Sequence, residues 1–288
     1  MPAFTLGTAS INYIDVGRGV PFVFQHGIGG NVRQPRKIFS PPPGVRLLSF
    51  DARAHGSTVW SGDAAELSFN TFADDLVGLL NHLGIAHAMV GGISMGAGVA
   101  LNAATRYPER IAGLVLARPA WLARPMPRRT IGLFDLLVNV LRELDFSIAT
   151  DEGLDWAWRK LERNPVFAAL AHRYSDTAWS LRNQLTAQRA VDGVARLERL
   201  PRDRPIADLR QPTVLHVPTV VLAHQQDPIH PFAYGQRLAN AIPGARLVEV
   251  TSRSTNRQQH AAEMQQHIAA FLHELTGAPS RGLQRAAA

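Results

Sequence analysis

Short apolar runs alternate with segments of helical spacing along the first 120 residues. Four runs are rich in β-branched or aromatic residues and end at Gly, Pro or a polar residue, which predicts buried strands. They lie at 20–27, 45–51, 87–94 and 111–119. Between them, apolar residues at helical spacing over 72–85 and small residues over 95–108 predict helices. This alternation indicates an α/β fold with a mostly parallel central sheet and helices on both faces.

The alternation stops near Trp121 and resumes at 218–227 (PTVVLAHQQD). A helix over 231–242, a strand over 245–250 and a last helix ending at Leu275 are then predicted. The segment between lacks long β-branched runs and holds four of the five tryptophans, so we expect an α-helical insertion that could act as a lid, although each tryptophan could equally serve the insertion's own core. The expected organisation is a core of 1–120 and 216–276, a helical cap of 121–215 and a mobile tail of 277–288.

The composition favours one soluble enzyme-sized unit, because 46% of the 288 residues are hydrophobic and 18% are charged. The chain has no cysteine, which excludes disulfides, thiolate zinc sites and cysteine nucleophiles. The first residues lack the basic and apolar regions of a signal peptide, and no apolar run reaches the ~18 residues of a membrane span. We expect a cytoplasmic monomer or homodimer that acts on a small molecule without a metal or organic cofactor.

The net charge of +7 raises the possibility of nucleic-acid binding. The basic residues are, however, interleaved with acidic ones and form no stripe with stacking aromatic residues. We therefore expect no nucleic-acid partner.

Residues 91–98 read GGISMGAG and contain the pentapeptide Gly92-Ile93-Ser94-Met95-Gly96. This G-x-S-x-G pattern lies between a predicted buried strand and a helix of small residues, where a sharp turn lifts a serine to the edge of the sheet. Such a turn leaves no room for side chains beside the serine, which explains the glycines. Ser94 could instead be a simple helix N-cap, but capping alone would not require glycine on both sides.

A nucleophilic serine that attacks a carbonyl also needs N–H donors for the oxyanion. The backbone N–H of Met95 is one candidate. The glycine-rich loop HGIGG (26–30) directly follows a predicted strand, so the N–H of Ile28 is the second, with Gly27 and Gly29 shaping the loop. A plain glycine turn would give the same pattern.

The segments HGIGG, FDARAHGST (50–58), GGISMGAG and DPIHP (227–231), in this order, resemble the α/β-hydrolase superfamily with a helical cap. The resemblance covers the chain apart from the cap and the tail. It implies that Asp51, Arg53 and His55 are architectural, and Ala54 replaces a glycine that is usual in the family.

The resemblance also implies an acid after one of two late strands and a histidine base after the acid. Arg118-Pro119-Ala120 offers no acid, so Asp227 is the expected acid, although an Asp before Pro is also a common turn former. The family's glycine-histidine pair, expected near Ser254 and Thr255, is missing.

His260 is the predicted base, because the capping-box pattern at 255–258 starts the last helix there and places His260 at the catalytic edge of the sheet. His230, three residues after Asp227, is expected to shape the same loop.

Together these residues predict a serine hydrolase that cleaves a carboxylic ester of a small to medium, largely apolar substrate through an acyl-enzyme. Ser94, Asp227 and His260 are the expected catalytic residues. The same machinery would also suit an acyltransferase, a lactonase, a carbon-carbon bond hydrolase or a cofactor-free haloperoxidase. A catalytically silent binding protein on this fold is the alternative if the base is missing.

Overall fold

The computed structural model describes residues 1–144, 151–186 and 190–277. In these residues one sheet has the strand order β1-β2-β4-β3-β6-β7-β8-β9, and β5 pairs with β2. The pairs β1–β2, β2–β4 and β2–β5 are antiparallel, and every pair from β4 to β9 is parallel. The strands are β1 (Ala3–Leu6), β2 (Ala9–Gly17), β3 (Gly19–Gln25), β4 (Gly44–Phe50), β5 (Val59–Trp60), β6 (Ala88–Ile93), β7 (Ile111–Ala117), β8 (Thr219–Ala223) and β9 (Arg246–Glu249).

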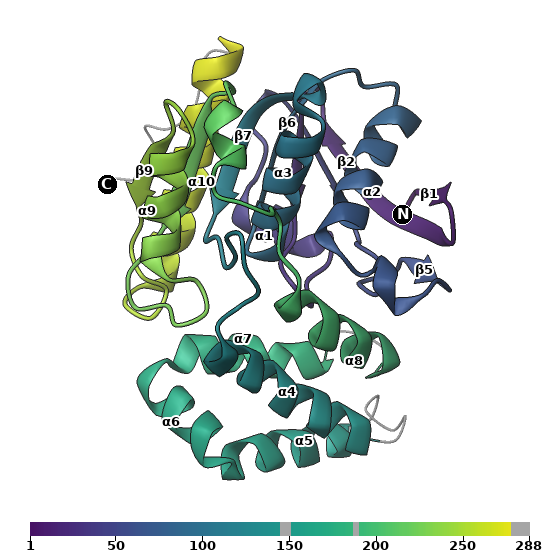
Figure 1. The fold of residues 1–288 in the computed structure, drawn as a ribbon, viewed down its shortest axis with the longest axis vertical. Coiled ribbons are helices and arrows are strands. Elements are labelled where there is room, and N and C mark those ends of the chain that lie inside the picture. Colours follow the sequence, from purple (N-terminus) through teal and green to yellow (C-terminus); the bar gives the residue numbers. More distant parts are fainter. Residues whose placement is uncertain (145–150, 187–189, 278–288) are drawn as a thin grey trace.

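Helices cover both faces of the sheet (Figure 1). The α-helices are α1 (Arg33–Ile38), α2 (Phe69–His82), α3 (Met95–Arg106), α4 (Arg128–Glu143), α5 (Asp151–Arg163), α6 (Pro165–Arg173), α7 (Ser175–Thr186), α8 (Ala190–Arg199), α9 (Phe232–Ala241) and α10 (Arg257–Thr276). Short 3-10 helices lie at Ala64–Glu66, Pro108–Arg110, Leu200–Arg202 and Gln211–Val214. The predicted α/β architecture, with a mostly parallel sheet between two helical layers, is confirmed.

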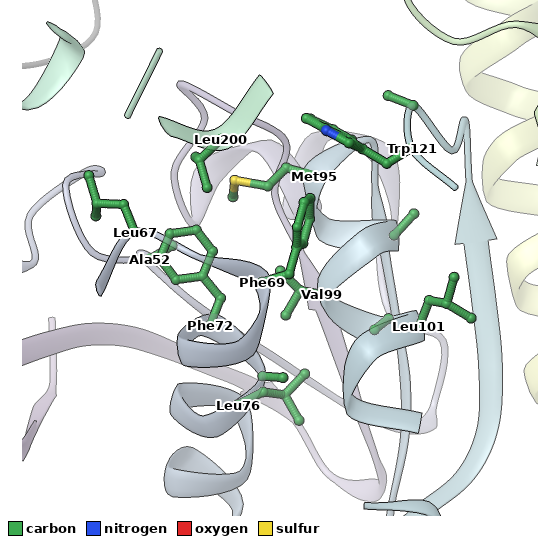
Figure 2. Close-up of a cluster of buried hydrophobic side chains, with 14 of the residues drawn as sticks. Ala52, Leu67, Phe69, Phe72, Leu76, Met95, Val99, Leu101, Trp121 and Leu200 are labelled. Atoms are coloured by element: carbon green, nitrogen blue, oxygen red, sulfur yellow. The ribbon is translucent and has the colours of Figure 1, made fainter. Parts of the chain in front are cut away.

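Alternate side chains of each buried strand point to opposite faces, and this period of two divides the core. Phe22 and Phe24 of β3 pack on one face with Met264 and Ile268 of α10. Val23, between them, packs on the other face, where α2, α3 and α9 lie. On that second face Phe69, Phe72 and Leu76 of α2 lie on the side of α3 that carries Met95 and Val99 (Figure 2). Both sides of the parallel strands are therefore buried, as their nearly continuous apolar runs predict.

The described residues between β7 and β8 include five α-helices, α4 to α8, that lie together beyond one end of the sheet (Figure 1). Its buried residues, such as Leu137, Leu161 and Phe167, are continuous with the core on the α2/α3 face. The loops after β3, β6, β7 and β8 lie at this end, because the carboxyl ends of parallel strands meet at one edge. The predicted tail at 277–288 lies outside the described residues beyond Gly277.

Candidate active site

Ser94 occupies the sharp turn between β6 and α3, with φ 57° and ψ −113°. A Cβ on Gly92 would lie 2.4 Å from the carbonyl carbon of Gly96, and a Cβ on Gly96 would lie 2.1 Å from the carbonyl oxygen of Gln25. Only glycine fits at these two positions, so the strained turn depends on both. The Ser94 hydroxyl makes no N-cap hydrogen bond with α3. It is therefore not used as a cap and remains available to the site.

The Ser94 hydroxyl is hydrogen-bonded to the imidazole of His230. Ser94 Oγ lies 2.8 Å from His230 Nε2, and His230 Nδ1 lies 2.9 Å from Asp227 Oδ2. The other carboxylate oxygen of Asp227 accepts the backbone N–H groups of Ile229 and His230, each at 3.1 Å. Because an ionised carboxylate only accepts hydrogen bonds, Nδ1 carries the ring proton and Nε2 is free to accept the Ser94 proton.

This geometry differs from the prediction for His260. Nδ1 of His260 is 2.8 Å from the carbonyl oxygen of Thr251, which ties the ring to the loop after β9. His260 is buried at the start of α10 and also lines the cavity described below, but the imidazole that reaches Ser94 Oγ is that of His230. Chain order had suggested a base well beyond the acid. The hydrogen bonds inside the Asp227 turn instead fold residue 230 back over the carboxylate.

The sequence carried a signal for His230 that we interpreted as structural. An Asp followed by Pro favours a tight turn, and residues three apart in such a turn lie on the same side. His230 was therefore the histidine closest to the acid by local geometry. The last helix also begins one residue later than its capping box suggests, because Asn256, rather than Thr255, caps it by accepting the Gln259 N–H at 3.0 Å.

Arg118 was noted in the sequence only because it replaces an acid, yet it contacts the same carboxylate. Its Nη2 donates to Asp227 Oδ2 at 2.5 Å and lies 3.2 Å from His230 Nδ1. Arg118 directly follows β7, has a positive φ of 46° and is 8% exposed. The carboxylate of Asp227 thus faces a guanidinium as well as an imidazole.

These neighbours set the protonation states. Burial raises the pKa of Asp227, but the Arg118 guanidinium and the hydrogen bonds from Arg118 and His230 hold this pKa well below its usual range. Burial lowers the pKa of His230, and Arg118 and Arg253 lower it further, while Asp227 opposes this change. His230 is therefore neutral, and Asp227 ionised, over a wide range around neutral pH. A neutral imidazole beside a serine hydroxyl is the state that can accept a proton.

The loop HGIGG lies next to Ser94. A Cβ on Gly27 would lie 3.4 Å from Ser94 Cβ, and the Gly27 N–H donates to Gln34 Oε1 at 2.7 Å. Within the described residues, the backbone N–H groups of Ile28 and Met95 donate to no other group of the protein. They are therefore available for a ligand.

Helix α7 of the insertion contacts this loop through Gln184. Its Nε2 donates to the carbonyl oxygen of Ile28 at 2.9 Å. Gly29 has a positive φ of 68°, and a Cβ there would lie 1.7 Å from Gln184 Oε1. Glycine at position 29 is thus required by the backbone conformation and by the close approach of the insertion.

A cavity of about 560 Å³ opens beside Ser94 between the sheet edge and the insertion. It is lined by groups of both parts of the fold, among them Ser94, Ile28, His230, Phe134, Trp179 and Leu181. Of the four tryptophans of the insertion segment, Trp179 lines the cavity, whereas Trp121 is buried against Phe69 with a centroid distance of 5.2 Å (Figure 2). The size suits a small to medium ligand.

The residues expected to be architectural are held in structural contacts. Asp51 accepts hydrogen bonds from Asn12 Nδ2, Val32 N and Ser57 N, each at 2.7 Å. Arg53 pairs with buried Asp75 at 2.9 Å. Asp51 thereby joins β2, the loop after β3 and the turn after β4.

Among the described residues, no cluster of three or more His, Cys, Asp or Glu side chains is arranged to hold a metal ion. Over the same residues, every helix is too short or too polar to cross a membrane.

Comparison with known proteins adds to this geometry. The family model described as "alpha/beta hydrolase fold" matches residues 20–252. The AB hydrolase superfamily protein YisY of Bacillus subtilis is 26% identical over 252 residues, which are 81% of this chain and 84% of that protein. A dihydrolipoyllysine-residue acetyltransferase component of an acetoin cleaving system from Pseudomonas putida is 36% identical over 110 residues, but the match spans only 36% of this chain and 28% of that protein.

Solved structures show the same architecture. An enol-lactonase from Burkholderia xenovorans superposes with a TM-score of 0.69 at 22% identity, covering 94% of this chain and 99% of that one. At this identity the likeness concerns the fold. The family-model match spans most of the chain and includes the turn that holds Ser94. The chain therefore belongs to the α/β-hydrolase family.

Proposed function

We propose that this α/β hydrolase cleaves carboxylic esters through an acyl-enzyme intermediate. In this proposal Ser94 is the nucleophile, His230 is the general base and acid, and Asp227 orients His230. The observation that supports it most directly is the 2.8 Å contact between Ser94 Oγ and His230 Nε2 on a strained turn that only glycine neighbours allow. His230 replaces His260 as the proposed base.

The proposed reaction has two halves. His230 Nε2 takes the hydroxyl proton as Ser94 Oγ bonds to the carbonyl carbon, and the carbonyl oxygen becomes an oxyanion between the N–H groups of Ile28 and Met95. When the ester C–O bond breaks, the leaving alkoxide takes the proton from His230. Water then loses a proton to His230 and attacks the acyl carbon, and the proton returns to Ser94 as the acid product leaves.

Asp227 acts through His230. Its carboxylate fixes the tautomer with the proton on Nδ1 and stabilises the imidazolium that forms in each half-reaction. Arg118 offsets part of this negative charge, so the imidazole is a weaker base than it would be with Asp227 alone. The helical insertion is proposed to act as a cap, since it lines the cavity beside Ser94.

A pair of histidine variants tests the assignment of the base. With His230→Ala, we expect labelling of Ser94 by a fluorophosphonate and turnover of 4-nitrophenyl acetate to fall by about 10⁴-fold or more, the size of effect seen when a triad base is removed. With His260→Ala, whose ring is bonded to Thr251, we expect activity within about tenfold of the wild type. Circular dichroism checks the folding of both variants.

Three outcomes separate the possible answers. If His260→Ala loses activity while His230→Ala keeps it, His260 is the base and the proposal for His230 fails. If the wild-type chain neither labels at Ser94 nor turns over esters, the chain is a binding protein on a hydrolase fold. If labelling succeeds but simple esters fail, assays with lactones, with carbon-carbon bond substrates and with alcohols as acyl acceptors test the other uses of the same machinery.

A further inference from the structure

The cavity beside Ser94 is strongly cationic. Its charged lining side chains, apart from histidine, are five basic residues and a single acidic one, namely Arg33, Lys37, Arg118, Arg253, Arg257 and Asp227. The carboxylate of Asp227 is already satisfied by Arg118 and His230. The remaining positive charge faces the space where a substrate would bind, with no acidic lining residue left to balance it.

Among these basic lining residues, Arg253 is half-buried and has no acidic partner. It lies in the loop between β9 and α10 and forms no hydrogen bond or ion pair with another residue of the described chain. Arg257, by contrast, has partners. Its guanidinium pairs with Asp176 and lies 5.2 Å from the ring centroid of Trp179. Arg33 and Lys37 are exposed at the rim.

The environment of Arg253 disfavours its charge. Burial lowers the pKa of Arg253, and the positive charges of Arg118 and Arg257 lower it further, while Asp176 and Asp227 act in the opposite direction. A half-buried guanidinium without a partner has lost part of its hydration and gained no hydrogen bond in return. An anionic ligand would supply both the missing charge and the missing acceptors. A carboxylate fits the planar fork of a guanidinium best when two N–H groups can donate in parallel.

The other lining residues of the cavity indicate which kind of molecule would carry this carboxylate. Ile93, Ile229 and Met264 line the same cavity and present apolar surface near Ser94 and His230. Such surface suits a short methylene chain between the reacting carbonyl and the anionic end. A substrate of this kind is apolar along its methylene chain, as the sequence predicted, but carries a charge at the end far from the reacting carbonyl.

We propose that Arg253 binds a free carboxylate on the substrate, so that the preferred substrates are esters that carry a carboxylate at the far end of a short apolar acyl chain. This inference rests on the proposed ester hydrolysis at Ser94. It also assigns a function to the loop after β9, which holds Arg253 next to Ser254 and Thr255, near which the resemblance placed the missing glycine-histidine pair.

Matched substrates test the proposal. The monomethyl esters of glutarate, adipate and pimelate are compared with the corresponding monoamides, which have nearly the same shape but no charge, by measuring methanol release. For the best chain length, we expect kcat/KM to be about tenfold or more higher for the carboxylate, as a charge-assisted hydrogen bond predicts. With Arg253→Gln, this preference should disappear, while kcat/KM for the monoamide stays within about threefold.

Arg210→Gln serves as the matched control. Arg210 is exposed, pairs with Asp208 and is not part of the cavity lining, so this variant removes the same charge without altering the site. Its preference for the carboxylate should equal that of the wild type. Equal kcat/KM for the two substrate series in the wild type, or a preference that survives Arg253→Gln, would overturn the proposal.

Binding to an inactive variant separates this inference from the proposed reaction. In Ser94→Ala, monomethyl adipate is titrated by calorimetry with and without the additional Arg253→Gln substitution. If no ester is cleaved but binding depends on Arg253, the proposed function fails and the carboxylate site stands. If esters are cleaved and binding does not depend on Arg253, the carboxylate site fails and the proposed function stands. Absence of both turnover and binding refutes both.

Discussion

His230 and Asp227 are three residues apart, and this spacing explains both their geometry and why sequence reasoning chose His260 in place of His230. The side chain of Asp227 closes its own turn by accepting the N–H groups of Ile229 and His230. That turn, rather than chain order, decides which imidazole meets the carboxylate. The position of Ser94 was predictable because its glycine neighbours are a local requirement. The choice between His230 and His260 was not, because it depends on the contact between segments 136 residues apart.

The contact between Arg118 and His230 predicts how the pH profile of activity changes in an Arg118 variant. In the proposed reaction His230 must be neutral to accept the Ser94 proton, and burial together with the charge of Arg118 lowers the pKa of His230. Arg118→Gln removes that charge, so the pKa of His230 should rise and a larger fraction of the imidazole should be protonated at mildly acidic pH. We expect the acidic limb of the kcat/KM profile to shift to higher pH, measured with a neutral ester.

Arg106→Gln is the control for this shift. Arg106 pairs with Asp74 on the surface and lies outside the cavity lining, so the variant loses the same charge but should leave the acidic limb in place. A limb that stays fixed in Arg118→Gln, or moves to lower pH, would show that Arg118 does not control the protonation of His230.

At the scale of the elements, backbone strain gathers at the carboxyl ends of the parallel strands. Among the described residues, the non-glycine residues with positive φ are Ala54, Ser94, Arg118 and Gln226, which follow β4, β6, β7 and β8 in turn. Such conformations cost of order 1 kcal/mol each and persist only where the surrounding structure enforces them. Ala54 thus adopts a conformation that favours glycine, at the position where the family usually has glycine.

The close packing of the turn between β6 and α3 predicts that one added methyl group at position 96 lowers both stability and reactivity. In Gly96→Ala, the new Cβ would overlap the Gln25 carbonyl oxygen, so β3 and α3 must separate. We expect a loss of about 3 kcal/mol or more in the free energy of unfolding, and a fall of at least ~100-fold in the rate of fluorophosphonate labelling of the folded fraction. Urea unfolding and labelling kinetics measure these two effects.

Gly132→Ala is the matched control, because a Cβ on this exposed residue of α4 meets nothing within 4 Å. It should leave labelling unchanged and stabilise the fold by about 0.5 to 1 kcal/mol, since alanine loses less backbone entropy in a helix. If Gly96→Ala behaved like Gly132→Ala, the close packing of the turn would not be required.

Most elements of the core were predictable because their periodicity is local. The apolar run at 111–119 became β7 and the helical spacing over 72–85 became α2, shifted three residues toward the N-terminus. The edge strands β1 and β5, the strand β2 between β1 and β4, and the short helix α1 were not predicted. Strands β1 and β5 are short and partly exposed, and the buried positions of β2 include the polar residue Asn12, so these strands give weaker apolar patterns than the strands covered on both faces. Arg253 could not be assigned to the site from sequence either, since its role follows from which charges remain unpaired in the folded cavity.

At the scale of the whole molecule, buried histidines couple stability to pH. Burial lowers the pKa values of five histidines, namely His26, His55, His224, His230 and His260. As the pH falls below 6.5, the unfolded chain binds more protons on these rings than the folded chain does. The free energy of unfolding should therefore fall as the pH falls. For His260 the pKa is lowered to about 4, which corresponds to about 3 kcal/mol lost between pH 6.5 and 4.

We accordingly expect the Tm to decrease steadily from pH 7 to pH 4.5 in thermal unfolding followed by circular dichroism. One group opposes this trend, because burial raises the pKa of Asp75 to about 6, so its protonation in the folded state stabilises the fold as the pH falls between 6 and 3.8. The five histidines should outweigh it. In His260→Gln the decrease in Tm should be smaller, and an identical slope in the variant would show that His260 does not contribute.

The short spacing of Asp227 and His230 also determines which positions of the sequence tolerate substitution. If the acid and the base both belong to one turn after β8, the connection between β9 and α10 carries no proton-transfer group. Ser252, Ser254 and Thr255 in that connection are then released from the reaction itself. Randomising these three positions, which flank Arg253 but lie outside the lining of the cavity beside Ser94, should yield active variants at a much higher frequency than randomising the turn at 226–229. The connection after β9 can therefore vary in sequence without loss of the proposed proton-transfer groups.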